Sequence, residues 1–145
     1  MTNTTIRRGT AANAAGALVV LYAITFLLGA VLHLGFAIPL GVTVLTEPII
    51  IPAAIVESLC GLGLAISGYA LFARRPWAGL ATVVAHGFAL AGVLLGMAAL
   101  AAGRGPSTEL NYAYHLTMLV LLAGGLVILP TRLARRALGR TDVAS

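Results

Sequence analysis

Charge is scarce in this chain of 145 residues: Asp, Glu, Lys and Arg together make up 9% of it, and hydrophobic residues make up 60%. Soluble domains are about 25% charged and about 45 to 50% apolar. Lysine is absent altogether, so all nine basic residues are arginine. This composition excludes an ordinary water-soluble domain and predicts a protein whose surface faces lipid, where apolar side chains point outward without cost.

Cysteine is nearly absent as well. The single Cys60 lies within an apolar run, which excludes an intramolecular disulfide and leaves the redox compartment undetermined. Only four residues are acidic, so the formal charge is +5. An excess of basic residues is typical of proteins that bind nucleic acid or anionic lipid, and of membrane proteins whose cytoplasmic segments carry arginine. The positions of the arginines indicate that they orient the protein in the membrane, and no nucleic-acid partner is expected.

Four long apolar runs dominate the rest of the chain. A helix that crosses a bilayer needs about 20 mostly apolar residues, and each run is about that long. The expected fold is all-α, an integral membrane up-down four-helix bundle that forms a single membrane domain over 1–145. The predicted helices cover about 14–38, 49–73, 77–102 and 110–129, with short cytoplasmic tails at 1–13 and 130–145.

The arginines predict how the bundle is oriented, because cytoplasmic segments next to membrane helices are rich in Arg and Lys. Eight of the nine lie in the two tails and in the loop at 74–75, and Arg104 alone lies in a loop on the other side. Both termini are therefore expected in the cytoplasm, with the chain as a multi-pass protein of the cell (plasma) membrane. A cleaved secretory signal is the competing interpretation of the first run. The apolar core of such a signal is usually about 7 to 15 residues long, and the first run is longer.

Small residues four positions apart indicate where helices approach each other in lipid. Gly92 and Gly96 form such a row on the third predicted helix, and this face suggests a helix contact or a homo-oligomer interface. On the second predicted helix, Glu57 shares a stripe with Ala53 and Gly61. The only carboxylate within an apolar run is therefore expected to point into the bundle.

Each predicted helix carries one ionisable residue: His33, Glu57, His86 and His115. Ionisable groups are costly in hydrocarbon and usually face the protein interior, which makes them candidates for function. The alternative is structural, because a neutral histidine can simply donate a hydrogen bond to a backbone carbonyl.

Depth in the membrane separates these four residues. With a rise of about 1.5 Å per residue, His33 and His115 lie about 8 Å below the outer ends of the helices, Glu57 about 12 Å and His86 about 24 Å. His33, Glu57 and His115 are therefore predicted to form a site near the outer leaflet, as catalytic residues or metal ligands. His86 lies deeper and is a candidate for a proton relay.

Three further polar residues are expected to support this site. Asn111 and Tyr112 precede His115 by four and three positions, which brings them near it on the helix surface. Thr82 lies one turn before His86 and is expected to orient it.

A divalent metal ion is the cofactor that two imidazoles and a carboxylate suggest. No two of these residues show ligand spacing within one helix, so the site depends on tertiary packing. Haem is not expected. Adjacent first and fourth helices about 8 to 10 Å apart leave no room for a porphyrin between His33 and His115, and His33 and His86 differ in depth by about 16 Å.

Three functions fit these observations, and the sequence does not decide whether the chain is an enzyme. The first is an outer-leaflet His/Glu site that binds a metal ion or performs acid-base chemistry on a small lipophilic substrate. The second is a proton-coupled small transporter in which Glu57 and His86 relay protons. The third is a non-catalytic membrane subunit whose polar residues only bond to neighbouring helices.

Overall fold

The computed structural model describes residues 3–104 and 108–128. Over these residues the chain forms four helices and two short strands: α1 (Asn3–His33), β1 (Ile38–Pro39), β2 (Val44–Leu45), α2 (Ile51–Phe72), α3 (Ala78–Ala101) and α4 (Glu109–Ile128). Each helix is long and apolar enough to cross a membrane, which confirms the predicted all-α fold with four candidate spans.

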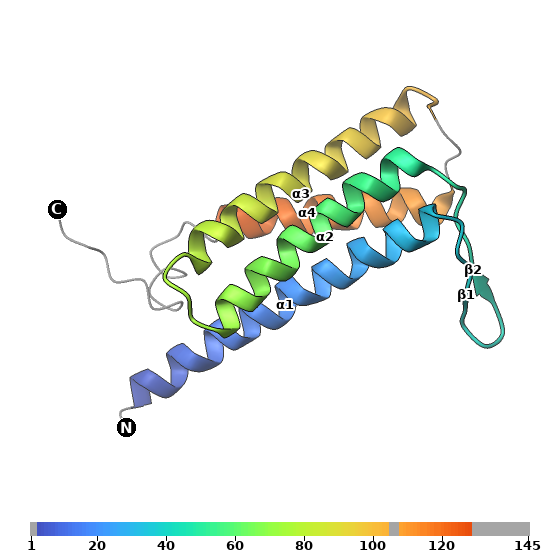
Figure 1. The fold of residues 1–145 in the computed structure, drawn as a ribbon. Helices are drawn as coiled ribbons and strands as arrows, with labels where there is room; N and C mark the ends of the chain where they lie inside the picture. Colours follow the sequence, from blue (N-terminus) through green and yellow to red (C-terminus); the bar gives the residue numbers. More distant parts are fainter. Residues whose placement is uncertain (1–2, 105–107, 129–145) are drawn as a thin grey trace.

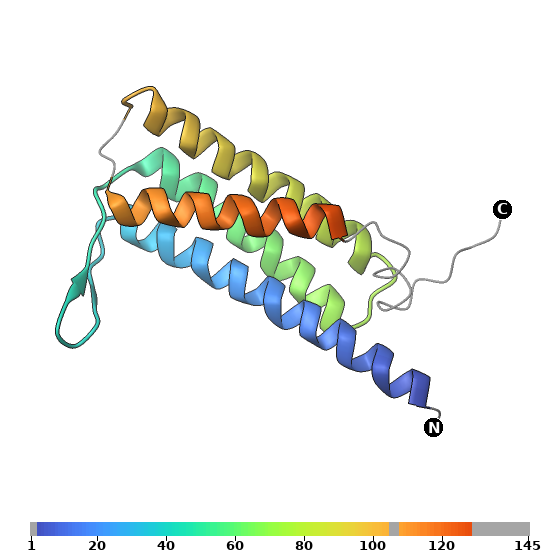
Figure 2. The same ribbon diagram turned by 180° about the vertical axis from the view of Figure 1, so that it is seen from behind.

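The four helices lie side by side along their length (Figures 1 and 2). α1 ends, α2 begins, α3 ends and α4 begins at one end of the bundle, and α2 connects to α3 at the other end (Figure 1). Close backbone contacts join α1 to α2, α2 to α3 and α3 to α4. α1 and α4 meet mainly through side chains, such as the edge-to-face rings of Phe26 and Tyr114, 6.0 Å apart.

The outer surface of the bundle is apolar. Large side chains on different helices, including Leu21, Leu62, Leu80 and Val120, are more than half exposed. A water-facing surface of this kind would be unfavourable, whereas a lipid-facing one costs nothing. The buried residues are mostly small or aromatic, which is typical of helices that associate through close approach.

Glycines set the spacing of the helices. A Cβ on Gly61 would lie 2.7 Å from Leu27 Cγ of α1, and one on Gly68 would lie 2.6 Å from Val20 Cγ2. The predicted row on α3 also packs within the chain: a Cβ on Gly92 would lie 2.9 Å from Cys60 Sγ of α2, and one on Gly96 would collide with the His115 ring of α4. Neighbouring helices of the same chain therefore occupy the Gly92 and Gly96 face.

α1 ends at His33, five residues before the predicted end at 38. Gly35 has a φ of +91° and ends the helix with two hydrogen bonds: its own N–H donates to Leu32 O (2.8 Å), and the N–H of Phe36 donates to Val31 O (3.3 Å). This is a Schellman cap, which favours glycine at the left-handed position. Because apolar residues continue past this glycine, hydropathy did not reveal the end.

The early end of α1 creates a hairpin that the sequence did not predict. Ile38 pairs with Leu45 and Pro39 with Val44 in antiparallel strands, and the hairpin projects beyond the ends of the helices (Figure 1). The returning chain then passes close to His33, whose carbonyl accepts a hydrogen bond from the N–H of Ile50 (3.0 Å). His33 is thus the last residue of α1, with the loop at 34–50 beside it.

The opposite end of the bundle carries basic residues. Arg74 and Arg75 are exposed in the connection between α2 and α3. The Arg75 guanidinium donates a hydrogen bond to Tyr69 Oη (3.2 Å), and its Cζ lies 5.9 Å from the centre of that ring. These two arginines and the hairpin therefore lie at opposite ends of the four helices (Figure 1).

Candidate functional site

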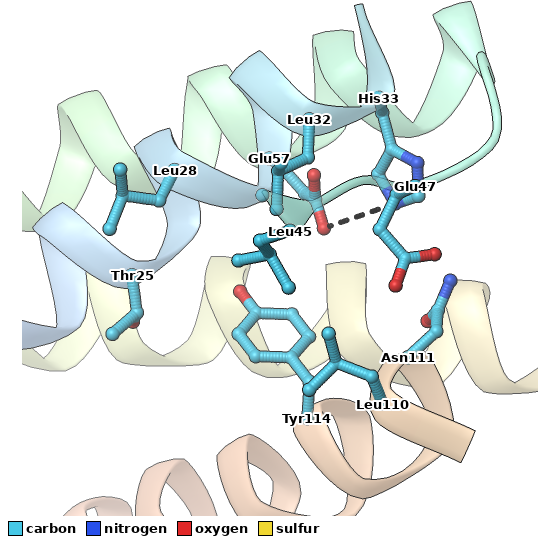
Figure 3. A pocket seen from close by; sticks show the side chains of 11 residues that line it. Thr25, Leu28, Leu32, His33, Leu45, Glu47, Glu57, Leu110, Asn111 and Tyr114 are labelled. Carbon is cyan, nitrogen blue, oxygen red and sulfur yellow. Dashed lines mark ion pairs between the residues drawn. The ribbon is translucent and has the colours of Figure 1, made fainter. Parts of the chain in front are cut away.

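A cavity of about 200 Å³ lies between α1, α2, α4 and the segment formed by the end of β2 and the loop that follows it (Figure 3). Most of its wall is apolar and includes Leu28, Leu32, Leu45 and Leu110. α3 contributes none of the residues that line it. The polar side chains of the wall come from four separate segments: Thr25 and His33 on α1, Glu47 in the loop after β2, Glu57 on α2, and Asn111 with Tyr114 on α4.

His33 and Glu57 form a buried pair in this wall, as their predicted depths suggested. His33 Nε2 lies 3.9 Å from Glu57 Oε1 (Figure 3). This separation suits an ion pair when the histidine is protonated, but it is too long for a direct hydrogen bond. His33 Nδ1 lies 3.1 Å from Pro48 O. Because a carbonyl only accepts, Nδ1 carries the hydrogen and Nε2 is the nitrogen that faces Glu57.

Gly29 makes room for the Glu57 carboxyl group. A Cβ at this position would lie 2.9 Å from Glu57 Oε2 and 3.0 Å from both Cδ and Oε1. The carboxyl group therefore lies directly against the backbone of α1, one turn before His33. Gly29 precedes His33 by four positions and therefore lies on the same face of the helix. This spacing in the sequence indicates that Gly29 faces the same site as His33.

Three side-chain atoms in the described part of the chain are buried without a hydrogen-bond partner: Glu57 Oε2, Asn111 Oδ1 and Tyr114 Oη. All three belong to residues that line the cavity, and Figure 3 shows the three side chains around it. An unpartnered buried polar atom costs roughly 1 to 3 kcal/mol, so such atoms are rare and usually serve a purpose. Their concentration in one cavity indicates a place where a polar group binds.

Glu47 and Thr108 connect the loop after β2 to the start of α4. Thr108 Oγ1 accepts a hydrogen bond from the N–H of Asn111 (3.0 Å), which is the usual contact of a helix-capping threonine. Its hydroxyl donates to the Glu47 carboxylate, 2.9 Å away at Oε1. These two bonds hold Glu47 and the first turn of α4 together at the edge of the cavity. Glu47 was not predicted as a site residue, because its position depends on the hairpin.

His115, the third predicted member of the site, does not line the cavity. Its Nδ1 donates to Asn111 O of the preceding turn (2.9 Å), and its ring packs against Gly96 of α3. Tyr112 is more than half exposed on the outside of α4 and does not line the cavity either, whereas Asn111 and Tyr114 do. Tyr114 follows Asn111 by three positions and shares its face, which was the available signal.

The predicted metal ligands are not assembled in this structure. Within residues 3–104 and 108–128, no group of three or more His, Cys, Asp or Glu side chains is arranged to hold a metal ion. His33 and Glu57 are adjacent, but the His115 ring is turned toward α3. The same orientation means that His33 and His115 do not face each other across a common space.

His86 belongs to a second polar cluster, away from the cavity wall. Its Nδ1 donates to Thr82 O (2.8 Å), and its ring meets that of Tyr22 edge-on at 6.0 Å. The Thr82 hydroxyl accepts from Ser67 Oγ (2.9 Å) and donates to Ala78 O (2.7 Å). Thr82 thus orients His86 through its carbonyl. A hydrogen bond from a histidine to a backbone carbonyl is what the structural interpretation of these histidines, the alternative to a functional one, predicts.

The cavity is therefore the candidate functional site, with the His33 and Glu57 pair at its polar end and leucines around the rest. Three helices contribute Gly29 and most of its polar residues. Gly29 and His33 on α1 face Glu57 on α2, and Asn111 and Tyr114 on α4 complete the wall. Comparison of the chain with protein-family models, with curated proteins and with solved structures finds no match, so the function of this site is inferred from its geometry.

Proposed function

We propose that this protein binds a small lipophilic molecule in the cavity between α1, α2 and α4, and that His33 and Glu57 act on the polar end of that molecule as an acid-base pair. One observation carries the proposal: three unpartnered polar atoms, Glu57 Oε2, Asn111 Oδ1 and Tyr114 Oη, belong to residues that line one largely apolar cavity. Polar groups at one end of an apolar pocket are the usual design of a small-molecule site.

The size and the position of the cavity agree with a lipophilic ligand. An apolar cavity of roughly 150 Å³ holds a benzene molecule, so about 200 Å³ accommodates a body of about six carbons. Leu28 of α1 and Leu110 of α4 line the cavity and are also about half exposed on the lipid-facing surface. The ligand is therefore expected to enter from the membrane, between α1 and α4.

The acid-base role follows from the contacts of the two side chains. Pro48 O holds the hydrogen on His33 Nδ1, so His33 Nε2 is free to accept a proton. Glu57 Oε1 lies 3.9 Å from Nε2, and Glu57 Oε2 has no partner. On binding, one proton moves between the polar group of the ligand and Glu57 or His33 Nε2, and it moves back when the ligand leaves. Only bonds to that proton are made and broken.

Photolabelling of the purified full chain tests this proposal. The probe is an uncharged analogue of 1-hexanol that carries a diazirine on its alkyl chain. We expect labelling that saturates near one probe per chain and that unlabelled 1-hexanol removes. Labelling that rises linearly with probe concentration and resists competition would show that the chain has no such site.

We also propose that the protein lies in the plasma membrane with both termini and the loop between α2 and α3 in the cytoplasm. The support is the distribution of arginines in the sequence: Arg74 and Arg75 are exposed in that loop, Arg7 and Arg8 lie near the start of α1, and four more follow residue 128. With this orientation the hairpin and the cavity lie toward the outer face of the membrane.

Cysteine labelling in intact cells tests the orientation. The background variant Cys60→Ala removes the sole cysteine, which is buried. Val42→Cys then marks the fully exposed tip of the hairpin, and Ala73→Cys marks the exposed α2–α3 connection without removing an arginine. We expect a membrane-impermeant maleimide to label Val42→Cys in intact cells and Ala73→Cys only after permeabilisation. The reverse pattern would overturn the orientation.

A further inference from the structure

The polar end of the cavity contains more acceptors than donors. Glu57 Oε2, Asn111 Oδ1 and the carboxylate of Glu47 accept hydrogen bonds, and the Tyr114 hydroxyl can accept as well as donate. The Asn111 amide nitrogen carries two N–H donors. Glu57 Oε2, Asn111 Oδ1 and Tyr114 Oη are buried without a partner. The one N–H of His33 is already bonded to Pro48 O, which leaves Nε2 as a further acceptor. A ligand that satisfies this end must therefore bring several donors of its own.

The charge of the cavity points in the same direction. Glu57 and Glu47 both contribute to its wall, whereas none of the arginines in the described ranges does, and the chain has no lysine. Glu57 and Asn111 are each 6% exposed. A carboxylate with so little access to water is costly unless a positive charge accompanies it. His33 supplies this charge only when it is protonated.

We infer that the ligand is a lipophilic primary amine, bound as its ammonium ion. This inference rests on the proposed function and specifies its substrate class. An ammonium group brings a positive charge and three N–H donors, and the cavity wall offers unpartnered acceptors, the Glu57 carboxyl group among them. The hydrocarbon body of the amine lies among the leucines of the wall, and its positive charge lies beside Glu57.

This ligand gives the acid-base pair a defined step. An amine that enters from lipid as the neutral base takes the proton of the Glu57 carboxyl group, which yields R–NH₃⁺ beside a carboxylate. On release, the ammonium returns this proton to Glu57 and the neutral amine leaves. The step transfers one proton and changes no other bond. It requires no co-reactant.

The same contacts disfavour other ligands of equal length. A carboxylate would meet Glu57 and Glu47 and would be repelled by both. An alcohol brings a single donor, and a quaternary ammonium brings charge but no N–H donor. The site is therefore expected to distinguish these four headgroups even when their alkyl chains are identical.

Competition against the photoreactive hexanol probe tests the inference on the purified full chain. The competitors are hexylamine, 1-hexanol, hexanoate and hexyltrimethylammonium, each corrected for its partition into detergent. We expect half-competition by hexylamine at a concentration roughly tenfold lower than that of the next best competitor, because hydrogen bonds between charged groups are stronger than neutral ones. Equal competition by hexyltrimethylammonium or by 1-hexanol would overturn the inference.

Two variants tie this preference to the site. Glu57→Gln keeps the shape of the side chain and removes its charge, and Tyr114→Phe removes only the hydroxyl group. Both are expected to reduce the advantage of hexylamine over 1-hexanol, Glu57→Gln by roughly tenfold. The matched control is Glu109→Gln, at an exposed position in the first turn of α4 that does not line the cavity. A full advantage in both site variants would contradict the assignment of the acceptors.

The outcomes separate this inference from the function on which it rests. Saturable labelling with equal competition by all four compounds would leave the proposed cavity in place and overturn the amine. The absence of saturable labelling in the wild type would overturn the proposed function, and the amine with it.

Discussion

Leucine in place of Gly29 is expected to weaken photolabelling by the hexanol probe strongly. A Cβ at this position would already lie 2.9 to 3.0 Å from the Glu57 carboxyl atoms, and the remaining leucine carbons would extend into the cavity. The substitution therefore fills the space that the probe needs and displaces the carboxyl group. We expect the concentration for half-saturation to rise at least roughly tenfold, which corresponds to about 1.4 kcal/mol.

The matched control for this substitution is Gly87→Leu on α3. A Cβ on Gly87 meets no atom within 4 Å, and α3 contributes no residue to the cavity. This variant makes the same chemical change in a helix but leaves the site alone, so its labelling is expected to match that of the wild type. Gly29→Ala serves as a smaller step if Gly29→Leu does not fold. Wild-type labelling of both Gly29 variants would show that the probe binds elsewhere.

Valine at Gly61 or Gly68 is expected to cause the largest loss of stability among substitutions in α2. In lipid, the hydrophobic effect does not drive helices together, and close packing takes its place. Gly61 and Gly68 allow α2 to approach Leu27 and Val20 of α1, and a Cβ on either would lie less than 3 Å from those side chains. Overpacking of this kind usually costs about 1 to 3 kcal/mol. The double variant is expected to lose more than either single one.

Unfolding of the detergent-solubilised protein by sodium dodecyl sulfate measures this loss. The controls are Gly87→Val and Gly124→Val, because a Cβ at either position meets no atom within 4 Å. We expect both controls to unfold near the wild-type midpoint and both α2 variants to unfold at lower detergent fractions. Equal losses in all four variants would mean that the cost arises from valine in a helix and not from the α1–α2 contact.

Hydropathy located three of the four helices well. The predicted ranges 49–73, 77–102 and 110–129 each lie within two residues of α2, α3 and α4 at both ends. The first range, 14–38, misses both ends of α1. Its start was missed because polar residues continue the helix beyond its apolar part, and its end was missed because Gly35 lies inside an apolar stretch.

Depth was predictable for the site residues, but rotation about the helix axis was not. Counting residues brought His33 and Glu57 to similar levels, and the structure places them 3.9 Å apart. His115 was assigned to the same level, yet its ring is turned toward Gly96 of α3. Which side of α4 faces the cavity depends on how four helices pack together, and the sequence of α4 alone does not determine this.

Loop residues were the least predictable part of the site. Leu45 and Glu47 reach the cavity only because α1 ends early and the chain returns through the β1–β2 hairpin. Pro48 enters the site through its carbonyl, which any residue could provide. Such contacts arise from the path of the backbone, so side-chain chemistry in the sequence gave no indication of them.

The most direct test of the central claim is to map the sites of photolabelling in the wild-type chain by peptide mass spectrometry. If a lipophilic ligand occupies the cavity, the 1-hexanol-sensitive label will lie on residues 25–33 of α1 and 110–114 of α4, with Glu57 as a further target. α3 is an internal control, because it exposes many apolar side chains but does not line the cavity. A competable label on α3, or none on α1 and α4, would contradict the account.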